Sequence, residues 1–162
     1  MKISKHITYA EATKSQTAIR KGIDNKPTLQ QLANMKLVAE KCFEPLRESH
    51  GKPIGISSFL RGEELNKEIG GSPTSGHCAG IVSGHEEAAI DIDADIFDNG
   101  ITNRDIFFWL QGNVEFNELI WEYGDDVNPS WVHILWRKGD NNKEILRAVR
   151  GMNGKTKYIP FI

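Results

Sequence analysis

Ala88-Ala89-Ile90-Asp91-Ile92-Asp93-Ala94-Asp95 is the stretch of sequence that decides the fold. Successive side chains of a β-strand point to opposite faces, so every second residue of this run shares a face. Ile90, Ile92 and Ala94 form an apolar face, while the three aspartates fall on the opposite face together with Ala89. The pattern predicts a strand that covers a hydrophobic core on one side and presents carboxylates on the other.

Upstream of this strand, the sequence predicts a long helix. Thr28 and Gln31 have the spacing of a capping box, in which each side chain bonds a free backbone N–H at the helix start. Apolar residues then recur at intervals of three and four as far as Leu46, which predicts one buried stripe. Pro45 is expected to kink or end this helix. The preceding 27 residues are polar and end in turn-forming residues.

The remaining elements are bounded by glycine, proline and capping residues. Residues 72–87 are rich in serine, glycine and proline and are predicted to form a loop. Residues 143–150 are predicted to form either a strand or a short helix. The other predictions are strands over 54–60, 116–123 and 131–137, a short helix over 63–69, and a helix from Thr102 to Gly112. This mixture of elements, without a repeat or a linker, predicts one α+β domain over residues 1–162.

Composition excludes several classes of protein. The chain has 39% hydrophobic and 26% charged residues, as ordinary globular proteins do. Its 20 basic and 22 acidic residues give a net charge of -2, so no overall basic surface favours nucleic acid or an anionic membrane. The N-terminal segment lacks the apolar run of a signal peptide, which predicts synthesis in the cytoplasm. Cys42 and Cys78 are accordingly expected to be free thiols.

Three side chains are candidate metal ligands. Asp91 lies on the acidic face of its strand, His133 projects from the strand predicted over 131–137, and His77 follows Ser75 and Gly76 in the predicted loop. Catalytic zinc usually takes three nitrogen or oxygen ligands and leaves one position for water. Spacing alone also fits a structural histidine that only forms hydrogen bonds.

Eight short segments, in order along most of the chain, carry a family resemblance. They are Ala18 to Asn25, Glu44 to Arg47, Ser58 to Arg61, Glu64 to Asn66, Gly70 to His77, Ala89 to Asp93, Leu119 to Glu122 and Trp131 to His133. Over about residues 9–134, the chain resembles the zinc D-alanyl-D-alanine carboxypeptidase and dipeptidase family, especially its compact phage-associated branch. That family shares its fold and metal site with the Hedgehog signalling domain. The resemblance implies a small, mainly antiparallel sheet with helices packed on one side, and zinc held by His77, Asp91 and His133.

One departure from the family pattern concerns the first two ligands. The family places histidine and aspartate seven positions apart in S-x-H-x-x-G-x-A-x-D, whereas His77 and Asp91 are fourteen apart. About seven extra residues, within 81–87, account for the difference and repeat Ser-Gly-His at Ser83 to His85. His85 therefore competes with His77 as a ligand, although the family match on both sides of His77 favours the latter. A further interpretation is that the insertion covers the cleft and restricts the substrate.

The resemblance also implies roles for other residues. Arg61 matches the arginine that contacts substrate and stabilises the oxyanion, and Ser75 matches a serine that hydrogen-bonds substrate or supports the site. The general base of many relatives stands where this chain has Ser130, so Glu122 is assigned as the base, with Glu118 in reserve.

The expected function is zinc-dependent hydrolysis of a bond in the stem peptide of bacterial peptidoglycan, with a D-amino acid involved. The enzyme would act on the cell wall after release through a phage holin or another route. The substitution at Ser130 and the insertion favour a different possibility, a zinc-stabilised module that binds peptidoglycan or another partner without cutting it.

Overall fold

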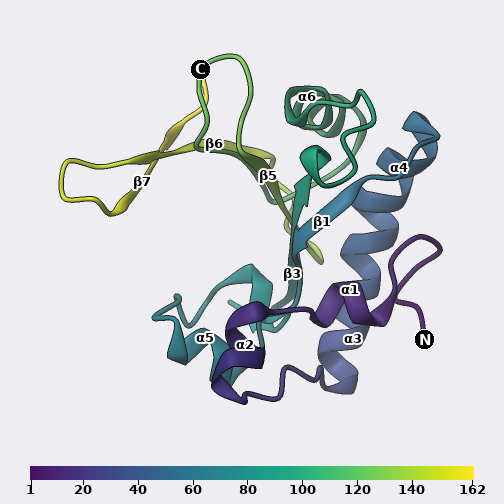
Figure 1. Cartoon of the computed structure of the whole chain (residues 1–162), viewed down its shortest axis with the longest axis vertical. Helices are drawn as coiled ribbons and strands as arrows, with labels where there is room; N and C mark the ends of the chain where they lie inside the picture. The colour runs from purple at the N-terminus through teal and green to yellow at the C-terminus, as the bar shows by residue number, and fades with distance from the viewer.

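The computed structural model describes all 162 residues and is built on a seven-stranded mixed sheet (Figure 1). The strands are β1 Gly55–Ser58, β2 Ile81–Val82, β3 His85–Asp93, β4 Glu118–Glu122, β5 Trp131–Arg137, β6 Glu144–Arg150 and β7 Thr156–Pro160. Their order is β1-β3-β5-β4-β6-β7, and β2 pairs with β3 beside this path. The α+β prediction is confirmed, and five of the six strand pairs are antiparallel, as expected. The sheet is larger than predicted, however, and it contains one parallel pair.

The correction arises from the position of β6. β4 and β5 are antiparallel, and the chain reverses again before β6, which then lies on the outer side of β4 and runs parallel to it. No long crossover is needed, because β5, which follows β4 in the chain and runs antiparallel to it, returns the chain to the end of the sheet at which β6 begins. β6 pairs in turn with β7, so the sheet extends well beyond the part that the sequence predicts. In Figure 1, β6 and β7 project from the body as a curved arm.

Helices cover mainly one face of the sheet (Figure 1). In chain order they are α1 Tyr9–Thr13, α2 Gln16–Lys21, α3 Leu29–Val38, α4 Glu44–His50, α5 Glu63–Glu68 and α6 Asn103–Asn113. Figure 1 shows α1, α3, α4 and α6 beside the same face of the sheet, while α2 and α5 lie together near one end of β3. None of these helices combines the length and the apolar character that a bilayer-spanning segment requires.

Local sequence explains where the main helices begin. Thr28 Oγ1 accepts a hydrogen bond from the Gln31 backbone N–H, and Gln31 Oε1 accepts one from the Thr28 N–H, which confirms the predicted capping box. Pro45 does not end the helix: a π-helical turn, η1 Ala39–Phe43, joins α3 to α4 just before it. A wider turn accommodates a proline because proline cannot donate the regular backbone hydrogen bond. Thr102 caps α6 as predicted.

The hydrophobic core lies between this helical layer and the apolar face of the sheet. Ile90 and Ile92 of β3 are fully buried, as their alternation with the aspartates predicts. Helix side chains complete this layer, among them Met35 of α3 and Phe107 of α6, which packs edge-on against Trp121 of β4. The helices that form this core do not cover the opposite face of the sheet. The polar side chains on that face can therefore form a functional site.

Residues 81–87 form a hairpin rather than the predicted loop. Val82 pairs with His85, so Ser83 and Gly84 make a two-residue turn, and both have positive φ angles, of 51° and 80°. Such a turn matches the twist of paired strands and therefore continues β3 outward instead of folding over the sheet. The insertion lengthens the sheet, and this geometry does not support a cover over the cleft.

Candidate metal centre

The register of two strands brings the first two candidate ligands together. Asp91 of β3 and His133 of β5 are direct cross-strand partners, and their side chains share the face that lies away from the helices. The distance from His133 Nδ1 to Asp91 Oδ1 is 2.9 Å. Both side chains are largely buried, with 14% of Asp91 and 11% of His133 exposed.

His77 reaches the same point from a loop. It lies on the short 3-10 turn η2 Gly76–Cys78, and its Nε2 is 3.2 Å from Asp91 Oδ1. Ser75 accepts a hydrogen bond from the His77 backbone N–H, which caps this turn. Gly76 lets the turn approach the sheet closely, because a Cβ atom here would stand 2.4 Å from Leu135 Cδ1 and 3.0 Å from Ala89 Cβ, which has no freedom to move aside. One ligand atom from each of His77, Asp91 and His133 lies within 4.8 Å of the others.

Hydrogen bonds on the outer ring nitrogens direct both imidazoles toward this point. His77 Nδ1 lies 2.8 Å from the Phe59 carbonyl oxygen, which can only accept, so Nδ1 carries a proton and Nε2 is the nitrogen that faces Asp91. His133 Nε2 lies 3.3 Å from Glu118 Oε1, which leaves His133 Nδ1 as the nitrogen that faces Asp91. Metal-ligating histidines characteristically donate their second N–H to a carbonyl or carboxylate in this way.

The electrostatics of the centre favour positive charge. Burial alone would lower the pKa of His133, but its hydrogen bonds to Asp91 and Glu118 raise the pKa to about 10. Burial would raise the pKa of the Asp91 carboxyl, yet the neighbouring His77 and His133 hold that pKa well below its ordinary value. A pocket that stabilises a protonated imidazole so strongly also suits a divalent cation on the same atoms.

The three residues lie in a cleft of about 850 Å³ on the exposed face of the sheet. Glu122 of β4 lines this cleft and is only 7% exposed, and burial raises its pKa to about 7. Arg61 also lines the cleft, with its guanidinium donating to Asn66 Oδ1 at 3.3 Å, and Ser75 lies at the rim. Ser130, at the position where the sequence resemblance would place the base, is exposed; its backbone N–H donates to the Glu122 carbonyl and its own carbonyl accepts from Asn103 Nδ2.

The competing histidine lies elsewhere. His85 sits in the β2–β3 hairpin, where its Nδ1 is 2.7 Å from the Lys138 carbonyl oxygen, and it takes no part in the group formed by His77, Asp91 and His133. Sequence reasoning did not identify the ion pair of Glu87 with Arg137, which lines the end of the cleft. The same two-residue alternation that groups Asp91 with Asp93 also places Glu87 on this face, so the signal was present. Asp93 itself binds Asn103 and caps the next turn.

Comparison with known proteins identifies the family. The family model for Peptidase M15 matches residues 5–104, which is more than half of the chain. The chain belongs to the peptidase M15 family. No curated protein matches it. M15 enzymes are zinc-dependent metallopeptidases related to D-alanyl-D-alanine carboxypeptidases, and the donor set of two imidazole nitrogens and one carboxylate oxygen is one that catalytic zinc accepts.

Replacing Glu118 with glutamine tests whether it positions a ligand. The variant keeps the size of the side chain but removes the negative charge beside His133 Nε2, and zinc affinity is expected to fall about 10- to 100-fold. Competition with a chromogenic chelator measures the affinity. Glu115→Gln is the matched control, because Glu115 is exposed and pairs with Lys143 away from the centre. An unchanged affinity in Glu118→Gln would show that the contact does not support the metal.

Proposed function

We propose that this M15 protein is a zinc peptidase that hydrolyses a peptide bond in the stem peptide of bacterial peptidoglycan, with a D-amino acid at the cleaved bond. The observation that carries the proposal is the convergence of His77, Asp91 and His133 in a cleft that also contains the buried carboxyl of Glu122. The family match supports metallopeptidase chemistry, and the resemblance of the sequence to D-alanyl-D-alanine peptidases supports the substrate class.

We propose that His77 Nε2, an oxygen of Asp91 and His133 Nδ1 hold the zinc. When bound there, zinc would polarise the carbonyl of the cleaved bond and lower the pKa of water. Asp91 supplies one negative charge to the ion, and Glu118 and the Phe59 carbonyl keep the two imidazoles in the required tautomers.

Glu122 is the proposed general base. Its carboxylate takes a proton from the attacking water and passes it to the departing amine. A base works best when its pKa is close to the working pH, and a value of about 7 meets that requirement. Arg61 is proposed to bind substrate and to stabilise the negative oxygen of the tetrahedral intermediate, because guanidinium stays charged and donates in a fork. Ser75 supports His77 through the turn and lies at the rim, where substrate can also reach its hydroxyl.

The wider setting follows from the sequence resemblance. We propose that residues 1–162 act as one peptidase domain, that nucleic acid is not a partner, and that the enzyme reaches the cell wall after release by a phage holin or another route. The second candidate function, a zinc-stabilised module that binds without cutting, draws on the exposed Ser130 at the position of the usual base.

Digestion of purified peptidoglycan separates the two functions. The zinc-loaded protein is expected to release stem-peptide fragments, which mass spectrometry identifies together with the bond that is cut. Treatment with a chelator should stop the release, and added zinc should restore it, because the proposed reaction needs the metal for its nucleophile. Stoichiometric zinc without any new fragment would instead support the binding module.

A further inference from the structure

β1 lies at one edge of the sheet, and its outer side is free. The strand pairs only with β3, so the backbone N–H and C=O groups of every second residue point away from the sheet. Outside this pair, no backbone–backbone hydrogen bond involves Gly55–Ser58. Unpaired backbone groups at a strand edge are a template on which another peptide chain can pair.

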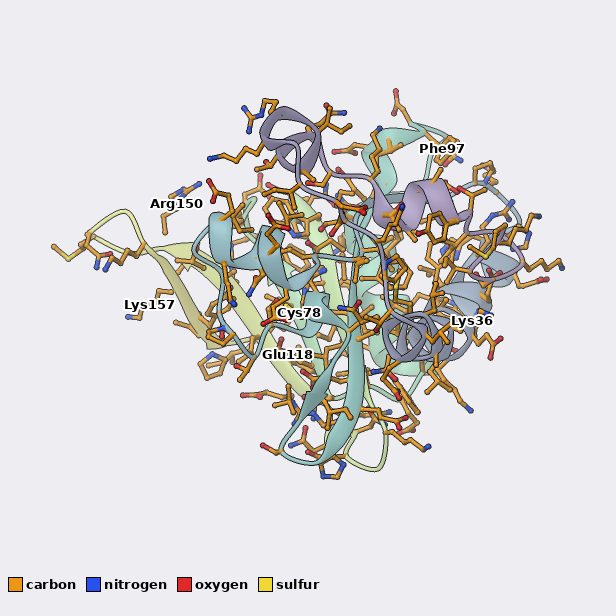
Figure 2. All side chains as sticks on the ribbon, turned by 90° about the horizontal axis from the view of Figure 1, so that it is seen from below. Lys36, Cys78, Phe97, Glu118, Arg150 and Lys157 are labelled. Atoms are coloured by element: carbon orange, nitrogen blue, oxygen red, sulfur yellow. The ribbon has the colours of Figure 1, made fainter.

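A groove of about 620 Å³ runs along this free edge. All four residues of β1 line the groove, although successive side chains of a strand point to opposite faces. A cavity that touches every residue in turn lies along the backbone edge and not over one face. Half-exposed Ile96 and Phe97 give the groove an apolar wall, and residues of α1 and of the turn after it also line the groove. Figure 2 shows Phe97 at the surface beside this N-terminal segment.

The groove leads into the metal cleft through the residues that follow β1. Ser58, the last residue of the strand, is the cross-strand partner of Asp91. The carbonyl oxygen of the next residue, Phe59, accepts the ring N–H of His77. Arg61 lines both the groove and the cleft. A substrate chain that Arg61 binds in the cleft can therefore continue along β1.

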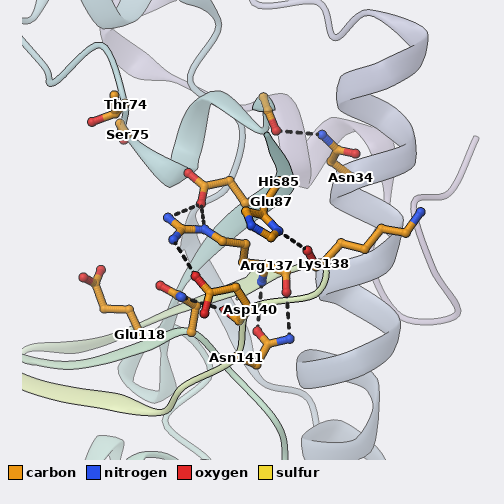
Figure 3. Close-up of polar contacts among 12 residues, drawn as sticks. Asn34, Thr74, Ser75, His85, Glu87, Glu118, Arg137, Lys138, Asp140 and Asn141 are labelled. Atoms are coloured by element: carbon orange, nitrogen blue, oxygen red, sulfur yellow. Dashed lines mark hydrogen bonds and ion pairs between the residues drawn. The ribbon is translucent and has the colours of Figure 1, made fainter. Parts of the chain in front are cut away.

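The end of the cleft around Glu87 differs from this edge. There, Arg137 holds Glu87 and Asp140 in ion pairs, and Figure 3 shows the two carboxyl groups gathered at the guanidinium. Charged groups that bind one another present little to a peptide backbone. β1, by contrast, presents free backbone donors and acceptors, which is the chemistry by which a sheet edge recognises a peptide.

The form of the edge suits a short peptide better than a second copy of the protein. Gly55–Ser58 has only four residues, and its register with β3 shifts between Ile56 and Ser58. Short edge strands and bulges discourage the pairing of whole sheets, and bulges are common beside active sites. Four residues of strand span about 13 Å, which is the length of three to four residues of extended peptide.

We propose that the groove along β1 binds three to four residues of the substrate peptide as an added strand. The inference rests on the proposed peptidase function and defines its substrate further, as a peptide that extends beyond the cleaved bond in preference to a free dipeptide. In this mode of recognition, hydrogen bonds to the backbone of β1 supply affinity. The wall formed by Ile96 and Phe97 contacts the side chains of the bound chain.

Peptides of different length test the groove. Each contains the bond that the peptidoglycan digestion identifies. A short peptide has only the two residues of that bond, and two longer ones carry four further alanine residues on the amino or the carboxyl side. The zinc-loaded wild type is expected to cut one of the longer peptides with a kcat/KM about tenfold higher than the short one, because several backbone hydrogen bonds form along β1.

Methylation of single backbone nitrogens in the preferred extension tests the strand pairing itself. Only every second N–H of an added strand faces β1. Methylation of those nitrogens should lower kcat/KM about two- to tenfold, the size of one hydrogen bond, and methylation of the nitrogens between them should have little effect. This pattern with a period of two is specific to strand addition.

Replacing Phe97 with alanine tests the apolar wall. The variant should reduce the advantage of the longer peptide over the short one about fivefold, because part of an aromatic contact is lost. Phe97 lies outside the hydrophobic core, so the variant is expected to fold. Ile81→Ala is the matched control, since Ile81 is an exposed apolar residue that does not line the groove. It should keep the full advantage.

Several outcomes would overturn the groove. Equal kcat/KM for the short peptide and both longer ones would do so and would leave the peptidase function standing. A methylation effect that does not alternate along the extension would also overturn it, as would an equal loss for short and long peptides in Phe97→Ala. If no peptide is cut but calorimetry shows that one longer peptide binds more tightly than the short one, with the alternating methylation effect, the peptidase function fails while the groove stands.

Discussion

Replacing His77 with alanine is expected to abolish stoichiometric zinc binding and to lower peptidase activity by about a thousandfold or more. The change removes one of three protein ligands and with it the metal, whose stabilisation of the transition state amounts to several kcal/mol. The measurement is zinc content by elemental analysis, together with kcat/KM on the peptide substrate. Circular dichroism should show a folded protein, because the core lies on the other face of the sheet.

His85→Ala is the matched control for this prediction. It removes the same side chain from the neighbouring Ser-Gly-His segment, where the ring hydrogen-bonds the Lys138 carbonyl and lies outside the candidate metal centre. Zinc content and activity should both stay at the wild-type level. The opposite pattern, with zinc kept in His77→Ala and lost in His85→Ala, would move the metal centre into the hairpin.

The sequence predicts the strands of the centre better than it predicts their neighbours. Alternation alone defines the acidic face of Asp91, and the family pattern points to His77 and His133. The contact of Asp91 with His133 depends on a register between residues 42 positions apart, which only the folded sheet sets. The parallel pairing of β6 with β4 could not be predicted either, because the residue pattern of a strand does not indicate which strand it pairs with. The pairing places Glu144 beside Glu118.

Short elements escape prediction for a different reason. α1 and α2 have five and six residues, too few for a helical period to emerge, although Thr8 and Ser15 cap them. The hairpin at residues 81–87 has only two residue pairs between β2 and β3. Two pairs are too few for a strand pattern to be recognised, so the serine and glycine of the turn suggest a loop. The sequence also does not predict which residues the hairpin brings together. In the folded protein, Glu87 at its end forms an ion pair with Arg137 of β5.

Replacing Glu122 with glutamine is expected to leave zinc binding intact and to lower kcat about 100- to 10,000-fold, the range that a general base contributes. Glutamine fills the same space but cannot accept the proton of the attacking water. Zinc content and kcat are measured on the same sample. Full activity in Glu122→Gln would show that another residue is the base. Loss of zinc would show that Glu122 supports the metal, which is the result expected of Glu118→Gln and not of this variant.

The stability of the same variant adds a second test. Burial raises the pKa of Glu122 to about 7, so the charged form is less favourable in the folded protein than in the unfolded chain. A raised carboxyl pKa costs stability above the ordinary pKa, and the cost grows until the folded group has also ionised. Glutamine removes this cost, so the metal-free variant should melt no lower than the metal-free wild type at neutral pH. Retained stability with lost turnover is expected only if this buried carboxyl serves the reaction rather than the fold, whereas a lower Tm would assign it to structure.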